Sequence, residues 1–394
     1  MQSTVPAAPV AATRPAPKYE PLPKPSRLDL PRGPLPNPPP AIAVKAALRL
    51  RRALHKLADA LCPADLAAFD HLTGMAKANT LAALVRHSVA DILEKGPLSA
   101  VEISERAGLD ADAVHRALRA SATVGFFHLR SDGRFENTRL SRTLISGQMN
   151  RIREFALYFM SGSNAAAWSD LPKTLETGEA AFDRLHGTTV WDWYTKHPDE
   201  EAMFAHVMMG ITLVEAPVIA SLYPWTEHET VCDVGGGRGT LLSEILVRHA
   251  KVRGVLCEAP ALIESARELL DSRGVLARAE LVVGSFFERV SPGADAYVLK
   301  NIMHDWDDTN ATKILRVVRE AAKPGAKVVI CESIVERGSR DPKGTLADIQ
   351  MMVGCSNGRE RGVEEFRSLF RGAGFELGRV FPYPTISVIE GVAV

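Results

Sequence analysis

The sequence predicts an α/β protein in which a doubly wound, mostly parallel sheet follows an N-terminal all-helical and winged-helix domain. Three observations support this fold class. Short apolar runs alternate with amphipathic helical segments over 226–394, as expected for parallel strands joined by crossover helices. A glycine cluster separates a strand-like run from a helical segment over 231–246, and two short helical segments followed by a hairpin pattern occupy 99–138.

The composition is typical of a globular protein with more than one core. The chain has 394 residues, of which 46% are apolar and 24% are charged. Lys and Arg together number 47, as do Asp and Glu, so no excess charge favours nucleic acid or a membrane surface as a partner. The five cysteines include no C-x-x-C pair, which fits a reducing compartment better than a disulfide framework or a zinc site.

The N-terminal segment, residues 1–42, differs from the rest in composition. Its first 40 residues hold 13 of the 25 prolines and only two acids, so we expect a disordered tail, with a targeting or docking role as the alternative. The segment lacks the apolar stretch of a secretion signal. No run in the chain reaches about 18 apolar residues, so we expect no membrane span and a cytoplasmic location.

Residues 43–150 are expected to form a helical and winged-helix domain. A helix begins near Ala43 with Leu and Ala on one face and Arg and Lys on the other. Further along, two helices and a hairpin with an Asp-Gly turn at 132–133 make a winged helix, a motif that commonly binds DNA. Asp110 and Asp112 lie at the start of the second helix and would repel phosphate, so we expect no nucleic-acid partner.

Apolar stripes in this N-terminal domain predict a homodimer. The helical segments at 43–72 and 81–93 carry more apolar surface than a lone winged helix can cover. The following region, 151–225, is largely helical and rich in Met and aromatic residues, and we interpret it as a linker that contributes to a substrate pocket. The alternating region, 226–394, is then the cofactor-binding domain.

The glycine cluster is interpreted as a nucleotide-binding turn. Glycines let the backbone approach a ligand, and the helix that follows offers free N–H groups; the four glycines are Gly235, Gly236, Gly237 and Gly239. Glu258 ends the next apolar run, where a βαβ unit places an acid on a ribose diol. Leu242 stands where a dinucleotide fold needs a third glycine, and Asp233 would repel phosphate but could hold an ammonium. S-adenosylmethionine meets these demands better than a dinucleotide.

Four further stretches resemble, in order, motifs of the plant-type small-molecule O-methyltransferases and their bacterial relatives. They are WSDLPKTLETGEAAFDRLHGTTVWDWY (168–194), VGSFFERV (283–290), ADAYVLKNIMHDWDD (294–308) and NGRERGVEEFRSLFRGAGF (357–375). The resemblance covers roughly residues 75–390. It implies a Rossmann-like sheet, S-adenosylmethionine as cofactor, and a homodimer in which the N-terminal domain roofs the partner's active site. The expected reaction is methylation of a hydroxyl on an aromatic or polyene metabolite.

The resemblance also implies roles for individual residues. His304 matches the family's general base, and Glu332 and Glu360 match its two supporting glutamates, which we expect to hold the imidazole ring. Further cofactor contacts are expected from Ser285, Phe286 and Lys300, and substrate contacts from Phe204, Met208, Met351 and Cys355. The family usually has Asp where this chain has Glu258 and Ser285, so the Ser285 contact with adenine is weaker than usual because its oxygen is neutral.

The role of His304 can be examined from pKa values. A phenol near 10 and an imidazole near 6.5 differ enough that proton transfer in water costs roughly 5 kcal/mol. Removing the proton as the methyl group is attacked, in an aligned and dry site, makes this demand modest. Asp307 and Asp308 are expected to cap the next helix, and no metal site is expected.

Two other functions use the same fold. A winged-helix regulator that senses the cofactor would not need His304 or its glutamates and would want a basic recognition helix. Relatives that hydroxylate, decarboxylate or rearrange a substrate while keeping the cofactor form the second alternative. The three residues His304, Glu332 and Glu360 favour methylation over both.

Overall fold

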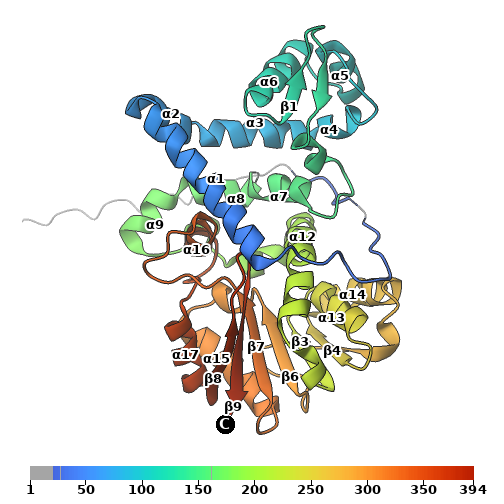
Figure 1. Ribbon diagram of the computed structural model, residues 1–394, viewed down its shortest axis with the longest axis vertical. Helices are drawn as coiled ribbons and strands as arrows, with labels where there is room; N and C mark the ends of the chain where they lie inside the picture. Colours follow the sequence, from blue (N-terminus) through green and yellow to red (C-terminus); the bar gives the residue numbers. More distant parts are fainter. Residues whose placement is uncertain (1–20, 27, 161) are drawn as a thin grey trace, which may run out of the picture.

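The fold is built on a seven-stranded sheet with the strand order β5-β4-β3-β6-β7-β9-β8 (Figure 1). The computed structural model describes residues 21–26, 28–160 and 162–394. The strands are β3 (Thr230–Val234), β4 (Arg253–Glu258), β5 (Ala279–Val283), β6 (Ala296–Lys300), β7 (Lys327–Glu332), β8 (Phe375–Phe381) and β9 (Ser387–Ala393). The first five are parallel and β9 runs antiparallel to both of its neighbours. The predicted mostly parallel, doubly wound sheet is confirmed.

Helices cover both faces of this sheet. One face packs against α12 (Pro198–Leu222), α13 (Thr240–Arg248) and α14 (Pro260–Ser272), and the other against α15 (Asp308–Ala321) and α17 (Val363–Gly372). Successive side chains of a strand point to opposite faces, so in β3 Val231 joins the α12 side while Cys232 joins the α15 side. By the same alternation Asp233 and Lys300 share the α12 side, and Glu332 lies on the other.

One strand, β8, was not predicted from the sequence. It lies at the edge of the sheet, it contains Gly378, and its burial pattern does not alternate cleanly. Phe375, Leu377 and Val380 pack against the core on one face, but a register shift between Leu377 and Val380 interrupts the alternation, so the hydrophobic pattern of this edge strand is weak.

The N-terminal domain contains the expected winged helix. It comprises α3 (Gly74–Arg86), α4 (Val89–Ile92), α5 (Ala100–Ala107), α6 (Ala111–Thr123), the hairpin β1 (Phe127–Leu129) and β2 (Phe135–Asn137), and the turn η1 (Ser141–Leu144). Ser99 and Glu102 form a capping box at the start of α5, and Asp110 caps α6. The acids at the start of α6 therefore serve the helix N-terminus.

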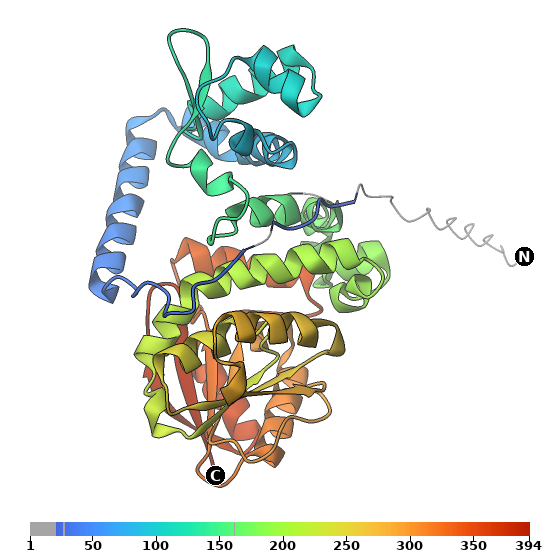
Figure 2. The same ribbon diagram turned by 90° about the vertical axis from the view of Figure 1, so that its right-hand side faces the viewer.

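Two helices, α1 (Ala41–Leu61) and α2 (Ala64–Leu72), stand apart from the body (Figure 2). All 21 residues of α1 are described and none is buried within the single chain. Leu54 and Leu57 of α1 are 56% and 55% exposed, and Phe69 of α2 is 66% exposed. These helices therefore present an apolar surface that the single chain leaves open to solvent.

A helical layer connects the two domains. It contains α7 (Ile152–Phe159), α8 (Gly162–Ser169), α9 (Leu171–Thr177), α10 (Ala181–His186), α11 (Val190–Tyr194), α12 and, from the far end of the chain, α16 (Pro342–Gly354). Contrary to the sequence-based expectation, α12 is long and apolar enough to cross a membrane by length and composition. Within the protein, 56% of its most apolar window is buried, and it packs against α7 and α13. This placement is typical of a core helix.

The expectation of a disordered tail over 1–42 is wrong for its described part, although residues 1–20 lie outside the described residues. Residues 21–26 and 28–40 run in extended form along the body (Figure 2). Leu35 is 2% exposed, and its N–H donates to both carboxylate oxygens of Glu244 at 3.1 and 3.2 Å. Arg273 donates to the Pro31 carbonyl at 2.6 Å, and Tyr383 to the Pro39 carbonyl at 2.8 Å. Composition failed here because polar groups of the body and the apolar side chains of Met209, Leu213 and Leu269, rather than a core of its own, hold this segment.

Candidate active site

The glycine cluster forms the turn between β3 and α13, as predicted. Gly235, Gly237 and Gly239 have φ values of 66°, 58° and 74°, in the left-handed region that favours glycine. Gly236 has no room for a side chain, because a Cβ would lie 2.4 Å from Asp233 Oδ2. A Cβ on Gly235 would come within 2.9 Å of Ile302, so the turn needs bare backbone there as well.

Two carboxyl groups flank this turn. Glu258 ends β4, and its two carboxylate oxygens accept the N–H groups of Gly237 and Ala259, each at 2.6 Å. Asp233 is 1% exposed, and burial together with the nearby charge of Glu258 raises its pKa to about 7. Within the described chain, Asp233 Oδ2 has no hydrogen-bond partner. A buried carboxyl oxygen that lacks a donor beside bare backbone suits the ammonium of S-adenosylmethionine.

The remaining predicted cofactor residues have different surroundings; they are Phe286, Ser285 and Lys300. Phe286 would lie 3.2 Å from a Cβ on Gly235, so its ring borders the turn. Ser285 Oγ accepts the N–H of Phe287 at 3.2 Å, which leaves the hydroxyl hydrogen available to a ligand. Lys300 lies beside Asp233, but its Nζ is 3.0 Å from Glu215 on α12. The structure therefore gives the Lys300 ammonium a protein partner that the sequence did not predict.

His304 lies on the short turn η4 (Met303–Asp305) directly after β6. Asn301, with a φ of 52°, turns the chain out of the strand, and asparagine tolerates this conformation better than most residues. The His304 imidazole Nδ1 is 2.9 Å from Glu360 Oε1, and Nε2 is 3.6 Å from Asp305 Oδ1. The ring is therefore held between two carboxyl groups, of which Asp305 was missed by the sequence reasoning.

Glu332 does not hold the imidazole ring, contrary to the prediction. Its Oε1 accepts the backbone N–H groups of Ile302, Met303 and His304 at 3.1, 2.6 and 3.1 Å. Glu332 sits at the end of β7, next to β6, and therefore anchors the amide end of the turn rather than the side chain.

Arg361, also missed by the sequence reasoning, holds the other end of the same turn. It is 0% exposed, and its guanidinium donates to the carbonyls of Met303 and Trp306, each at 2.7 Å, and to Asp308. Because a guanidinium presents its donors in a rigid fork, it can bind both carbonyls at once. The NGRERG motif thus supplies two residues to the turn, and the position of Arg361 immediately after Glu360 was the available signal.

The carboxyl groups around His304 make it a strong base. Burial alone would lower the pKa of His304, but Asp305, Glu360 and Glu332 outweigh burial and raise it to about 10. Burial raises the pKa of Asp305 to about 6 and that of Glu332 to about 7, and His304 opposes both shifts. The ordinary imidazole pKa of 6.5 therefore underestimates the basicity of His304.

Aromatic residues from the helical layer lie against the residues after β6. Trp191 stacks on Trp306 with ring centroids 6.0 Å apart, and Phe204 contacts Trp191 and Tyr194 at 5.9 and 5.1 Å. The other substrate candidates are also partly or fully buried: Met208 one turn from Phe204 on α12, Met351 on α16, and Cys355, whose Sγ is 3.7 Å from Asp305 Oδ1. Cys355 thus reaches the immediate surroundings of His304.

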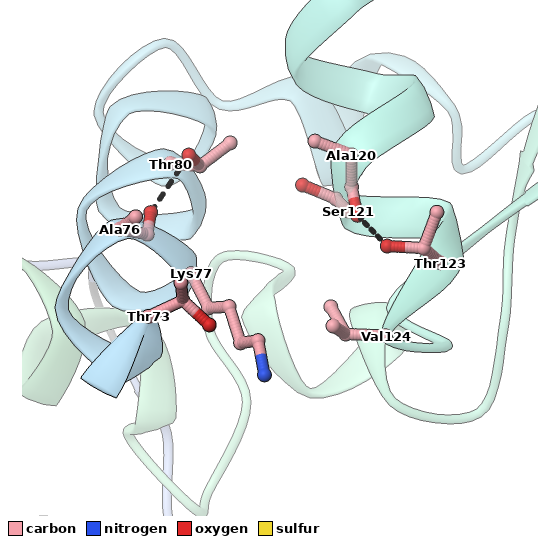
Figure 3. Close-up of a pocket in the computed structure, with 8 residues that line it drawn as sticks. All are labelled: Thr73, Ala76, Lys77, Thr80, Ala120, Ser121, Thr123 and Val124. Atoms are coloured by element: carbon pink, nitrogen blue, oxygen red, sulfur yellow. Dashed lines mark hydrogen bonds between the residues drawn. The ribbon is translucent and has the colours of Figure 1, made fainter. Parts of the chain in front are cut away.

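One pocket of the molecule lies away from this site. A pocket of about 160 Å³ between α3 and α6 contains one charged side chain, Lys77, which is paired with Asp70 (Figure 3).

Asp307 caps α15, as predicted, by accepting the N–H of Asn310 at 2.7 Å. Among the described residues, no group of three or more His, Cys, Asp or Glu side chains is arranged to hold a metal ion.

A bare glycine turn, an acid at the end of the second strand and a partly buried histidine after the fourth define a cofactor-dependent α/β transferase. Comparison with known proteins identifies its family. The model of the O-methyltransferase domain matches residues 168–376, and that of the O-methyltransferase dimerisation domain matches residues 69–147. The chain belongs to this O-methyltransferase family and is an S-adenosylmethionine-dependent O-methyltransferase.

Individual relatives agree with this assignment. The chain is 33% identical to the mitomycin biosynthesis 6-O-methyltransferase of Streptomyces lavendulae over 79% of its own length and 89% of that protein. It is 32% identical to the phenazine O-methyltransferase PhzM of Lysobacter antibioticus over 81% and 93%. The solved structure of NcsB1, an O-methyltransferase from neocarzinostatin biosynthesis in complex with S-adenosylmethionine and 2-hydroxy-5-methyl naphthoic acid, has a TM-score of 0.73 and 29% identity, covering 82% of this chain and 98% of its own.

Proposed function

We propose that the protein methylates a phenolic hydroxyl of an aromatic secondary metabolite, with His304 as the base that takes the hydroxyl proton. The observation that carries this proposal is the His304 imidazole held between Glu360 and Asp305 on a turn that is fixed at both ends. Stacked aromatic side chains beside it suit a flat acceptor better than a flexible one. The relatives named above are O-methyltransferases of aromatic metabolites or of mitomycin biosynthesis, and this supports the same class of acceptor.

The cofactor would be held by the groups around the glycine turn. Glu258 is placed to accept the ribose hydroxyls, Asp233 the ammonium, and Phe286 borders the turn where an aromatic base could stack. When bound, S-adenosylmethionine supplies an electrophilic methyl group. Lys300 supports this arrangement indirectly, because its charge lowers the pKa of Asp233 while its ammonium is paired with Glu215.

His304 handles the proton of the acceptor. Glu360 binds Nδ1, whereas Nε2 lies 3.6 Å from Asp305 Oδ1, beyond hydrogen-bond distance, so Nε2 is the nitrogen that would take the proton of the acceptor hydroxyl. With a His304 pKa of about 10, proton transfer from a phenol of similar pKa is close to balanced in free energy. The resulting imidazolium is stabilised by Glu360 and Asp305, and the phenolate it pairs with is a far better nucleophile than the phenol.

Substitution of His304 tests this mechanism. His304→Ala should lower kcat by about 10²–10⁴, the range expected for losing a general base, while cofactor affinity stays near that of the parent. His249→Ala is the matched control, because His249 binds the Ala220 carbonyl at the end of α13, away from the turn. Near-parental kcat for His304→Ala, on an acceptor whose hydroxyl stays protonated at the assay pH, would sink the proposal.

The mechanism is also proposed to need no metal ion. Because His304 lowers the energy of the deprotonated acceptor, a Lewis acid on the hydroxyl is not required. Turnover should be unchanged after dialysis against EDTA, with a magnesium-dependent catechol methyltransferase as the positive control for chelation. Loss of turnover that is restored by Mg²⁺ would contradict this point.

We further propose that the chain is a homodimer through its N-terminal helices. The match to a dimerisation domain supports this, as does the exposed apolar surface of α1 and α2. Light scattering should give twice the chain mass at micromolar concentration, and Leu54→Glu with Leu57→Glu should weaken association. A fully active monomer would rule the proposal out.

The relatives reported above are methyltransferases, so the regulator and the non-methylating alternatives gain no support from them.

A further inference from the structure

A line of polar contacts leads from His304 to an acid that the sequence did not single out. Asp305 lies beside the imidazole, and the Cys355 thiol lies 3.7 Å from Asp305. The next residue, Ser356, donates a hydrogen bond to Asp183 Oδ2 on α10. Asp183 thereby joins the helical layer to the loop that carries Glu360.

One carboxylate oxygen of Asp183 is able to accept a further hydrogen bond. Its Oδ1 is buried and has no hydrogen-bond partner within the described chain, and burial raises the pKa of this carboxyl. Glu360 shows the same feature closer to the base, because it is 6% exposed and its Oε2 is buried without a partner. Two unpartnered carboxylate oxygens, one of them on a side chain that is almost fully buried, point to a ligand that brings hydrogen-bond donors.

Along this line, carboxyl groups outnumber cations. After burial, the pKa values of His304, Asp305 and Cys355 are shifted by one another and by the carboxyls of Glu360, Glu332 and Asp183. Arg361 is buried nearby, but its donors are committed to backbone carbonyls and to Asp308. The His304 imidazolium already lies between Glu360 and Asp305, so a carboxylate on the acceptor would meet more negative than positive charge.

Resting on the proposed function, we infer that the acceptor is a phenol with a second hydrogen-bond donor, a hydroxyl or an amine, which binds Asp183. The same acid disfavours acceptors that carry a carboxylate. In this respect the protein should differ from NcsB1, whose structure was solved with a hydroxynaphthoic acid. Asp183 is then a specificity residue for the known reaction, remote from the transferred proton.

The test is a comparison of naphthols that share a skeleton. The full-length enzyme is assayed by transfer of an isotope-labelled methyl group to four probes: a plain naphthol and its derivatives with an added hydroxyl, amine or carboxylate. We expect kcat/KM for the hydroxyl or amine probe to exceed that for the carboxylate probe by about 10- to 100-fold, the range for one hydrogen bond to a charged group. Asp183→Asn should reduce this ratio at least about tenfold, through KM more than kcat, and change the plain naphthol by less than about threefold.

Asp170→Asn is the matched control, because Asp170 lies on the same helical layer and pairs with Arg184 rather than with Ser356. It should keep the parental ratio. A parental enzyme that prefers the carboxylate probe, or an Asp183→Asn ratio within twofold of the parent, overturns the inference, and the first of these needs no variant to fold. Methylation of none of the four probes would instead count against the proposed function itself.

Discussion

Neutralising Asp305 should move the pH dependence of catalysis in a direction that the structure fixes. The charge of Asp305 is the largest single contribution that raises the pKa of His304 from its ordinary 6.5 to about 10, and Glu360 contributes through both its hydrogen bond and its charge. This difference of about 3.5 units corresponds to about 5 kcal/mol in favour of the imidazolium, net of the opposing effect of burial. Since three carboxyls share the effect and the charge of Asp305 is the largest single contribution, Asp305→Asn should lower the pKa of His304 by about 1–2.

The kinetic consequence follows from the proton count. The imidazolium and the phenol each carry one titratable proton, and methyl transfer requires that one of the two has been lost. kcat/KM therefore rises with pH until that proton has dissociated. In Asp305→Asn this rise should occur about 1–2 pH units lower, and the plateau at high pH should fall because the base is weaker. The positive charge of the bound cofactor's sulfonium affects the parent and Asp305→Asn alike, so the difference in pH dependence between the two enzymes remains.

The assay is kcat/KM from pH 6 to 11 with an acceptor of known pKa. Asp112→Asn serves as the control, because Asp112 lies at the exposed start of α6. A profile for Asp305→Asn that coincides with the parental one, or that moves to higher pH, would refute the account of how the carboxyl groups set the basicity of His304.

Three further outcomes are expected. Glu258→Ala should weaken binding of S-adenosylmethionine by about 2–3 kcal/mol in calorimetry, because charge-assisted hydrogen bonds are lost, and affinity within twofold of the parent would contradict the assignment. Arg361→Lys should lower kcat at least about tenfold with little change in cofactor affinity, since an ammonium cannot bind both carbonyls of the His304 turn; unchanged kcat would remove Arg361 from the positioning role. Asp233 has a pKa of about 7 rather than 3.8, so the cofactor-free protein loses stability as pH rises through this window. Asp233→Asn should then be more stable than the parent at pH 8, by up to about 4 kcal/mol in urea unfolding, but not at pH 3, and a difference independent of pH would exclude this origin.

The sequence predicted the fold well where a pattern is set by neighbouring residues. The alternation of strands and helices, the glycine turn and the capped helices of the winged helix all depend on local chemistry, and the structure confirms them. Prediction from the sequence failed where the residues that hold a segment in place are distant in the chain. The extended segment at 28–40 is held by Glu244 and Arg273, more than 200 positions away, which no local pattern can indicate.

The active site shows the same division. Motif order located His304 and Glu360, which contact each other across 56 positions, but not the way in which Glu332 contributes. A strand end predicts which residues meet at the sheet edge and does not predict which atom of each residue makes the contact. Glu332 was expected at the ring and is found at the backbone amides, and Lys300 was expected at the cofactor and is found paired with Glu215.

The turn that carries His304 explains why three separate segments must fold before the base is in place. Its amide end is bonded by Glu332 from β7, its carbonyl end by Arg361 from the loop before α17, and its imidazole by Glu360 from that same loop. A residue on an isolated loop would lose this orientation, because a short turn supplies few hydrogen bonds of its own. The position of His304 is therefore set by the β6–β7 pairing and by the C-terminal motif together, and changes in that motif should affect kcat even where they do not touch the acceptor.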